Sequence, residues 1–274
     1  MNSLKETAFQ CVAVPEFPPK PRQRGLTMVI DYGLGLPHQS GLIESAGYFL
    51  DMVKFATGLA RVMPAGVLKQ KIERYQENGV HTFPGGQFFE LAYLQGRAEA
   101  YLEEVKAVGF SHVEISENCI DLPPEKKAEY IRRAVDEGLK VLGETGSKLK
   151  KSTPEHILGD LENCREAGAW KVFVEAAEFL TDQGLNMQLV EALTQSVDTD
   201  FLIFEIPSQW MKGVTFSTQY GFWKLLMHHI GPDVNLANIQ HEEILRLSLM
   251  RLGLGADTTL DRGAFVMTQR GELP

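Results

Sequence analysis

Carboxylate side chains stand at the ends of several short β-rich runs, and their repetition is the main chemical signal in the sequence. Glu144, Glu175 and Glu205 each end such a run, while Asp31 and Glu114 stand at or beside the ends of two others. A single carboxylate in this place usually caps a helix or faces solvent. Several that converge on one site raise one another's pKa values unless a cation lies among them.

The expected cation is Mg²⁺, because carboxylate oxygens are hard ligands and the sequence has no His/Cys cluster. We expect a subset of Glu144, Glu175 and Glu205 to hold it. Ion pairing with lysines, without any metal, is the alternative.

Two lysines are candidates to form ion pairs with these carboxylates. Lys54 lies inside the apolar run 52–56, where a buried ammonium is costly unless it points at a partner. Lys148 follows Glu144 by four residues, across the short segment Thr145-Gly146-Ser147. The alternative for Lys54 is that its side chain reaches solvent at a strand end. The alternative for Lys148 is that it belongs to the basic surface run 148–151.

Glycines and amides supply candidate substrate-binding groups. Gly85 and Gly86 end a β-rich run and open a helical stretch, so their backbone can approach a ligand and the helix start favours an anion; a plain tight turn is the alternative. Asn235 and Asn238 lie around the last run, where amides either cap a helix or bind an oxyanion. The predicted substrate-binding set is Asp31, Gly85, Gly86, Glu114, Asn235 and Asn238.

Other catalytic signatures are missing from the sequence. The seven histidines form no H-E-x-x-H pair, and there is no G-x-S-x-G segment. The three cysteines are odd in number and no two have C-x-x-C spacing. This pattern argues against a disulfide framework or structural zinc and favours a reducing compartment.

An alternation of short β-rich runs and helical stretches must position these residues. The eight runs are Leu26–Asp31, Met52–Phe55, Val80–Phe83, His112–Ile115, Lys140–Glu144, Lys171–Glu175, Phe201–Glu205 and Val234–Leu236. Helix-exit glycines such as Gly79 and Gly109 precede several of them. The alternation implies parallel strands, because each return crossing needs a helix.

Eight such units in one chain predict an α/β protein with a single (β/α)8 TIM barrel, whose strand ends form one mouth. A doubly wound sheet is the runner-up, but no Gly-x-Gly-x-x-Gly follows the first run. The dense prolines of residues 1–24 predict an extended, Pro-rich N-terminal arm. We assign residues 25–257 to the barrel and residues 258–274 to a C-terminal tail.

The composition is that of an ordinary globular protein. Of 274 residues, 44% are hydrophobic and 23% charged, and the formal net charge is −9. Negative charge disfavours a nucleic-acid surface, and no apolar run approaches the roughly 20 residues of a membrane span. The N-terminus has no secretory signal pattern. We expect a cytoplasmic homo-oligomer that binds a small anionic substrate, without nucleic-acid or membrane partners.

Seven segments, taken in order, resemble the phosphosulfolactate synthase family across roughly residues 20–257. They are Arg24–Asp31, Val53–Phe55, Phe83–Gly86, Val113–Ser116, Glu144–Lys148, Phe204–Glu205 and Asn235–Ile239. The resemblance implies a (β/α)8 barrel and a magnesium-dependent lyase that adds sulfite to phosphoenolpyruvate, giving phosphosulfolactate for coenzyme M biosynthesis. It also implies catalytic roles for Lys148 as proton donor, assisted by Glu144, and for Lys54 as a holder of phosphate or sulfite.

Two other readings remain open. Plant stress proteins resemble the same family, so the chain could be a non-catalytic barrel. It could also be an aldolase that forms a Schiff base at Lys54 or Lys148.

The chain departs from the family pattern at several loop positions. Tyr32 and Ala177 stand where members carry a lysine and an arginine, and Ser208–Trp210 replaces a Pro-Gln-Lys-like stretch. These changes remove positive charge and add apolar bulk. We therefore expect a divergent member that acts on phosphoenolpyruvate and sulfite poorly, and whose substrate is a related unsaturated acid.

Overall fold

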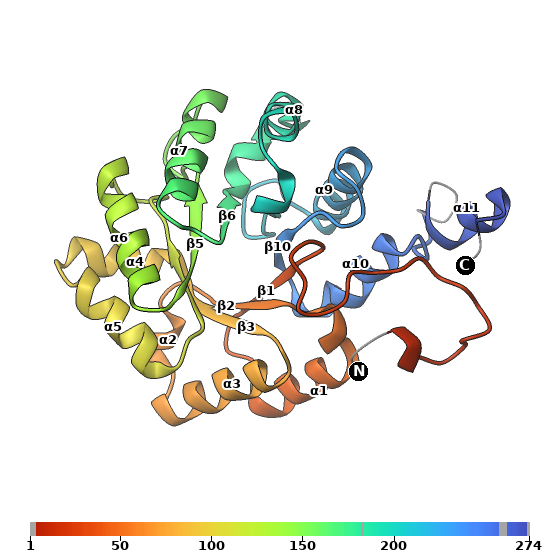
Figure 1. Cartoon of the computed structure of the whole chain (residues 1–274), viewed down its shortest axis with the longest axis horizontal. Coiled ribbons are helices and arrows are strands. Elements are labelled where there is room, and N and C mark those ends of the chain that lie inside the picture. Colours follow the sequence, from red (N-terminus) through yellow and green to blue (C-terminus); the bar gives the residue numbers. More distant parts are fainter. Residues whose placement is uncertain (1–3, 182–183, 258–261, 273–274) are drawn as a thin grey trace.

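The computed structural model describes residues 4–181, 184–257 and 262–272, and its centre is an eight-stranded parallel sheet that curls into a nearly closed barrel. The barrel strands are β1 (Thr27–Asp31), β2 (Met52–Phe55), β3 (His81–Pro84), β4 (His112–Ile115), β5 (Lys140–Thr145), β6 (Lys171–Val174), β9 (Leu202–Glu205) and β10 (Leu236–Ile239). Figure 1 shows helices arranged around these strands. The predicted (β/α)8 TIM barrel is therefore confirmed.

The helices that follow the strands are mostly two to four turns long. They are α1 (Leu36–Ala46), α2 (Leu59–Val62), α3 (Ala65–Glu77), α4 (Gly86–Leu94), α5 (Ala98–Val108), α6 (Pro124–Asp136), α7 (Pro154–Glu166), α8 (Met187–Ser196), α9 (Phe216–His229), α10 (Ile244–Arg251) and α11 (Gly263–Arg270). Short 3-10 helices cover Leu4–Glu6, Gly47–Phe49, Ala176–Phe179, Thr199–Phe201 and His241–Glu243. A small antiparallel pair joins β7 (Leu180–Thr181) to β8 (Gly184–Leu185).

Side chains close the barrel where the backbone ladder does not. The sheet order β3-β2-β1-β10-β9-β6-β5-β4 leaves β3 and β4 at its two ends, although they lie side by side. The Ser111 hydroxyl accepts a hydrogen bond from the Thr82 N–H at 3.1 Å and donates to the Thr82 carbonyl at 3.3 Å. The rings of His81 and His112, one on each of these strands, are tilted by 42° with centroids 4.5 Å apart.

Inward-facing residues form an apolar layer beneath a layer of carboxylates. Leu142, Phe173 and Ile203 belong to the apolar cluster inside the barrel. Because strand side chains alternate between faces, the residues two positions further on also face inward, nearer the mouth. Those residues are Glu144, Glu175 and Glu205, and all three are buried. The same alternation places Lys54 above inward-facing Met52.

Seven of the predicted runs agree with strands to within one residue at each end, but the eighth is displaced. The run predicted at 234–236 is a strand at Leu236–Ile239. Asn235 therefore precedes the strand and Asn238 lies near its end, and at about 3.3 Å per residue the two amides are at opposite ends of the barrel.

The segment before β1 has no helix or strand from residue 13 to residue 24 and contacts the end of the barrel opposite the mouth. Arg22 is buried over the rings of Phe17 and Tyr48, and its guanidinium lies 3.4 Å from the Asp51 carboxylate just before β2. The boundaries predicted at residues 24 and 257 stay predictions. Residues 258–261 and 273–274 of the expected tail lie outside the described residues, and the part between them contains α11.

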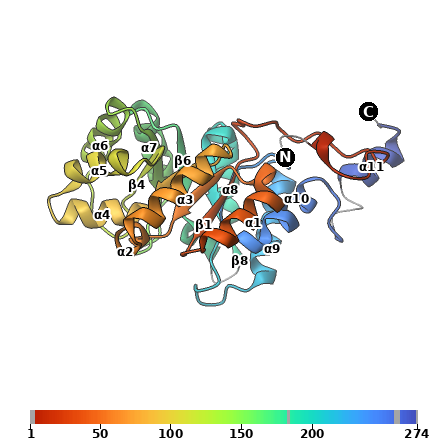
Figure 2. The ribbon, with the colours of Figure 1, turned by 90° about the horizontal axis from the view of Figure 1, so that it is seen from below.

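Figures 1 and 2 show α11 and the short 3-10 helix Leu4–Glu6 together on one side, away from the barrel strands. None of the helices in the described ranges is long and apolar enough to cross a membrane.

Candidate active site

A cavity of about 180 Å³ opens at the carboxyl ends of the barrel strands. Its lining includes the charged side chains Lys54, Glu114, Glu144, Lys148, Glu175 and Glu205. It also includes Gly85, Gly86 and Asn238, so most of the residues selected from the sequence lie together in one place. Their chemical roles stay predictions.

Lys54, on β2, is held between two carboxylates. Its Nζ lies 3.0 Å from Oε1 of Glu114 and 2.9 Å from Oε1 of Glu205, and 4.7 Å from the centre of the Phe173 ring. Burial alone would lower the pKa of Lys54, but the charges of Glu114 and Glu205 outweigh it and raise the pKa well above its ordinary value. These contacts therefore favour the ammonium form of Lys54.

Glu114 and Glu144 form an unequal pair. Burial, together with the charges of Glu144 and Glu205, raises the pKa of Glu114 well above its ordinary value, although Lys54 opposes the shift. Burial would also raise the pKa of Glu144, but Lys148 and Lys54 hold it below its ordinary value. The two carboxyl groups are hydrogen-bonded to each other, and of the two Glu114 binds a proton more readily.

Lys148 contacts the carboxylate at the end of β6. Its Nζ lies 3.0 Å from Oε2 of Glu175, and 28% of its side chain is exposed. Burial and the charges of Glu205 and Glu144 raise the pKa of Glu175 to about 7. Burial opposes protonation of Lys148, but Glu144 and Glu175 raise its pKa.

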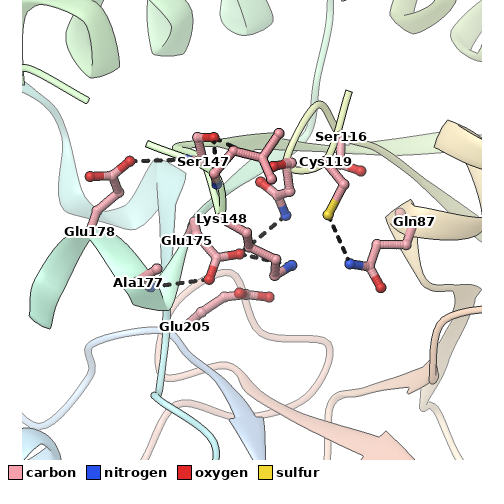
Figure 3. A network of polar contacts seen from close by, with 12 residues as sticks. Gln87, Ser116, Cys119, Ser147, Lys148, Glu175, Ala177, Glu178 and Glu205 are labelled. Atoms are coloured by element: carbon pink, nitrogen blue, oxygen red, sulfur yellow. Dashed lines mark hydrogen bonds and ion pairs between the residues drawn. The ribbon is translucent and has the colours of Figure 1, made fainter. Parts of the chain in front are cut away.

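Figure 3 shows Lys148 and Glu175 within a wider network. The Asn118 amide donates to Oε2 of Glu175 at 3.1 Å, and the Ala177 N–H donates to Oε1 at 3.0 Å. Both oxygens of Glu175 therefore have partners.

Two buried carboxylates outside the cavity lining fix the loops that carry these groups. Glu178 accepts hydrogen bonds from the Ser147 N–H at 3.0 Å and the Ser152 hydroxyl at 2.7 Å, and so holds the loop of Lys148. Glu90 accepts from the backbone N–H groups of Asn118 at 2.8 Å and Cys119 at 3.0 Å. Each of these two carboxylates therefore holds a loop that belongs to a neighbouring part of the barrel.

The two glycines after β3 are required by close approach. A β-carbon at Gly86 would lie 2.4 Å from the Ser116 Oγ, and one at Gly85 would lie 2.8 Å from the Thr57 backbone nitrogen. The Gly86 N–H donates to Oε2 of Glu114 at 3.0 Å. This N–H therefore orients a carboxylate rather than pointing freely into the cavity.

Asn238 has the features of a residue held for a ligand. Its φ of 61° is left-handed, which is uncommon for a residue other than glycine. The side chain is buried and lines the cavity, yet its Oδ1 has no hydrogen-bond partner among the described residues. Buried oxygens without partners are rare, so Oδ1 is available to a donor or a cation.

The structure does not bring Asp31 and Asn235 into the cavity. Asp31 alternates with inward-facing Ile30, so its carboxylate faces α3, where it lies 2.6 Å from Nζ of Lys71 and also accepts from the Gly33 N–H at 2.7 Å. Asn235 bonds the backbone of Leu26 and Leu202 at the far end of the barrel. Both side chains support the barrel and its loops rather than a substrate.

Sequence reasoning missed Asn118, Glu90 and Glu178. Asn118 follows β4 by three residues, and Glu178 follows Glu175 by three, so both stand in loops at the correct end of the barrel. This position in the loops is the feature of the sequence from which both residues could have been predicted. Glu90 lies within α4, and nothing in its spacing distinguishes it from a surface helix residue.

The carboxylates fit a divalent cation, with one change from the predicted set. Oxygens of Glu114, Glu144 and Glu205 lie within 4.8 Å of one another, whereas Glu175 is not part of this group. Three carboxylate oxygens are a hard donor set of the kind that suits Mg²⁺, and Asn238 lines the same cavity. Lys54 already neutralises part of this charge.

Comparisons with known proteins agree in the family they indicate. The family model described as (2R)-phospho-3-sulfolactate synthase (ComA) matches residues 15–257. A phosphosulfolactate synthase of Methanothermobacter thermautotrophicus is 34% identical over 250 residues, which cover 87% of this chain and 93% of the relative. Protein HEAT-STRESS-ASSOCIATED 32 of Arabidopsis thaliana is 25% identical over 269 residues, or 85% of this chain and 88% of the plant protein.

Among solved structures, the YdjI aldolase of Escherichia coli K12 superposes with a TM-score of 0.55 at 14% identity, covering 92% of this chain and 83% of the aldolase. At this identity the likeness concerns the fold alone.

Proposed function

The chain belongs to the phosphosulfolactate synthase family, and we propose that it is a lyase that adds sulfite, or a related nucleophile, to the double bond of phosphoenolpyruvate or a similar unsaturated acid with the help of Mg²⁺. The observation that carries the proposal is the convergence of four buried carboxylates and two ammonium groups on one cavity at the barrel mouth. Structural ion pairs alone would not require an open cavity at their centre.

In this reaction the sulfur lone pair of sulfite forms a bond to the terminal carbon of the double bond. The electron pair of the double bond moves toward the substrate carboxylate, and a proton then adds to the carbon beside that carboxylate. The sum is one new C–S bond and one new C–H bond, with no oxidation or reduction.

Two observations support Lys148 as the donor of that proton. Its raised pKa keeps it protonated at neutral pH, and Glu175 holds its Nζ at the cavity wall. Because 28% of the side chain is exposed, the amine can regain a proton from solvent after each turnover. General acids of this kind contribute roughly 10²–10⁴ to rate.

Glu114, Glu144 and Glu205 are the groups that would hold Mg²⁺. When bound, the ion would stabilise the negative charge that builds on the substrate carboxylate. Lys54 balances the charge of Glu114 and Glu205 and fixes their positions.

Two other functions are less consistent with the site. A Schiff base needs a neutral amine, whereas neighbouring carboxylates raise the pKa of both Lys54 and Lys148. A barrel without catalysis would have no use for an unpartnered oxygen such as Oδ1 of Asn238 beside buried charges.

The test is consumption of sulfite by purified protein in the presence of Mg²⁺ and a panel of unsaturated acids that includes phosphoenolpyruvate. We expect consumption with at least one acid, and we expect it to stop when the metal is chelated. Consumption that persists at the same rate in Glu144→Gln would contradict the proposal.

A further inference from the structure

Two exposed aromatic side chains stand at the rim of the cavity. Tyr32, in the loop after β1, is 60% exposed, and Trp210, in the loop after β9, is 70% exposed. Both contribute to the cavity lining, as does the neighbouring Met211. Within the described ranges neither ring has a hydrogen bond or an aromatic partner, so both faces are available to a bound molecule.

Hydrogen bonds hold the backbone of the loop that carries Trp210. The Met211 N–H donates to the Ser208 carbonyl at 3.0 Å, which closes a turn with Trp210 inside it. At the base of the loop, the amide of buried Gln219 donates to the Pro207 carbonyl at 2.7 Å and accepts from Gln209 at 3.1 Å. The backbone that carries Trp210 is therefore fixed before any ligand arrives, which reduces the entropy lost on binding.

The charges of the cavity do not suit a phosphate. Lys54 and Lys148 are the cations among the described residues that line it, and both already contact carboxylates. Four glutamates share the same lining, so the side chains carry more negative than positive charge even when Glu114 is protonated. A divalent cation would offset about one monoanionic acid, but not a phosphorylated acid together with sulfite.

The phosphate position common in TIM barrels is also unfavourable here. That position lies at the loops after the seventh and eighth strands, beside a short extra helix. In this chain the 3-10 helix after β10, His241–Glu243, contains Glu242 and Glu243 in its first turn. Negative charge at a helix start repels an anion.

Building on the proposed function, we propose that the unsaturated acid bears an uncharged, planar apolar group where phosphoenolpyruvate bears its phosphate. This group binds against Tyr32, Trp210 and Met211, while the carboxylate and the double bond lie deeper, among the charged residues. Tyr32 and Trp210 are then the residues that determine specificity.

The probes are three acids that share one double bond and one carboxylate: 2-phenylacrylate, acrylate and phosphoenolpyruvate. Isothermal titration in millimolar Mg²⁺ gives their dissociation constants. We expect 2-phenylacrylate to bind about tenfold more tightly than phosphoenolpyruvate. Trp210→Ala should weaken 2-phenylacrylate by about tenfold and acrylate by less than about twofold, because only the first ligand has a ring to lose contacts.

Trp210→Phe should restore most of the affinity, and Val62→Ala is the matched control, because Val62 is 78% exposed but lies outside the cavity lining. Three results would each overturn the inference. Phosphoenolpyruvate could bind more tightly than 2-phenylacrylate, or 2-phenylacrylate could show no measurable binding. The third result is that Trp210→Ala weakens the binding of 2-phenylacrylate and of acrylate equally. A separate sulfite-addition assay distinguishes the two proposals. The expected binding pattern without any C–S bond formation would reject the reaction alone, whereas turnover of a tightly bound phosphoenolpyruvate would reject this inference alone.

Discussion

The carboxylate of Glu178 accepts a hydrogen bond from the backbone N–H of Ser147 at 3.0 Å, one residue before Lys148. The same carboxylate accepts from the N–H and hydroxyl of Ser152. Gly146 leaves room for it, because a β-carbon there would lie 2.8 Å from the Glu178 Cγ. One buried side chain thus sets the position of the loop that carries the proposed proton donor.

Replacing Glu178 by glutamine should loosen this loop. The amide keeps one acceptor oxygen, and its NH₂ donor then faces at least one of the backbone N–H groups of Ser147 and Ser152, at a cost of about 1–3 kcal/mol. Hydrogen exchange at Ser147 and Ser152 should become faster, and kcat should fall more than KM changes. Glu155→Gln, an exposed change on α7, is the control. Unchanged exchange in the Glu178 variant would mean that other contacts hold the loop.

Removing the proposed proton donor should lower kcat without preventing substrate binding. For Lys148→Ala we expect a loss of about two to four orders of magnitude in turnover. Lys150→Ala changes an exposed lysine of the same loop and should have little effect. Equal rates for the two variants would assign Lys148 to the surface rather than to the chemistry.

The metal set can be tested by stability alone. Millimolar Mg²⁺ should raise Tm by a few degrees, roughly 2–4 °C per kcal/mol of binding free energy for a chain of this size. Glu144→Gln should abolish this rise, while Glu175→Gln should retain it, because Glu175 is not within the 4.8 Å group. Glu125→Gln on α6 is the control. A rise in Tm that Glu175→Gln also abolishes would return Glu175 to the set of metal ligands, as predicted from the sequence.

His81 should make the fold sensitive to acid. Burial, with Lys140 and Lys20 nearby, lowers the pKa of His81 from 6.5 to about 4. As the pH falls through 6.5 the unfolded chain binds a proton that the folded protein refuses, so stability is lost from about pH 6.5 down to about pH 4. Buried His112, whose pKa is also lowered, acts in the same direction.

Urea unfolding at pH 7 and pH 5 measures this effect. The contribution of His81 to the difference should be about 2 kcal/mol, and His81→Asn should reduce the difference by that amount. His156→Asn, at an exposed position on α7, should not. An identical pH dependence in His81→Asn would show that the ring is hydrated in the folded state.

Tyr32 and Ala177 stand where family members carry a lysine and an arginine, and the absence of these two cations should weaken activity toward phosphoenolpyruvate. Tyr32→Lys with Ala177→Arg adds two positive charges close to the cavity, each able to form a charge-assisted hydrogen bond worth about 1.5–3 kcal/mol. We expect phosphoenolpyruvate and sulfite to react slowly with the unmodified protein and faster with the double variant, as judged by kcat/KM. Robust activity in the unmodified protein would show that other residues bind the phosphate.

Periodicity in the sequence was sufficient to predict the barrel and the carboxylate layer. Glu144, Glu175 and Glu205 each lie within one residue of a strand end, so the place of these residues follows from the strand assignment and the alternation of faces. The position of Asn235 was predicted wrongly because Val234 and Leu236 are equally consistent with a strand that begins two residues and ends three residues too early. This displacement moved the amide from the mouth to the opposite end.

Contacts between distant residues could not be predicted in this way. Asp31 stands at a strand end like the other acids, but it faces outward to Lys71, 40 positions later in the chain. Glu90 and Glu178 act through backbone N–H groups of loops whose shape depends on the whole barrel. No local sequence pattern predicts such contacts, because they form only when distant strands are in register.

The most direct test of the account is a product analysis in D₂O. Purified protein, Mg²⁺ and sulfite are incubated with 2-phenylacrylate, acrylate or phosphoenolpyruvate, with the Methanothermobacter thermautotrophicus relative run in parallel on phosphoenolpyruvate. For at least one acid, we expect NMR to show a new C–S bond and one deuterium on the carbon beside the carboxylate, formed at a rate that Lys148→Ala greatly reduces. No C–S product from any of the three acids, while the relative is active, would contradict it.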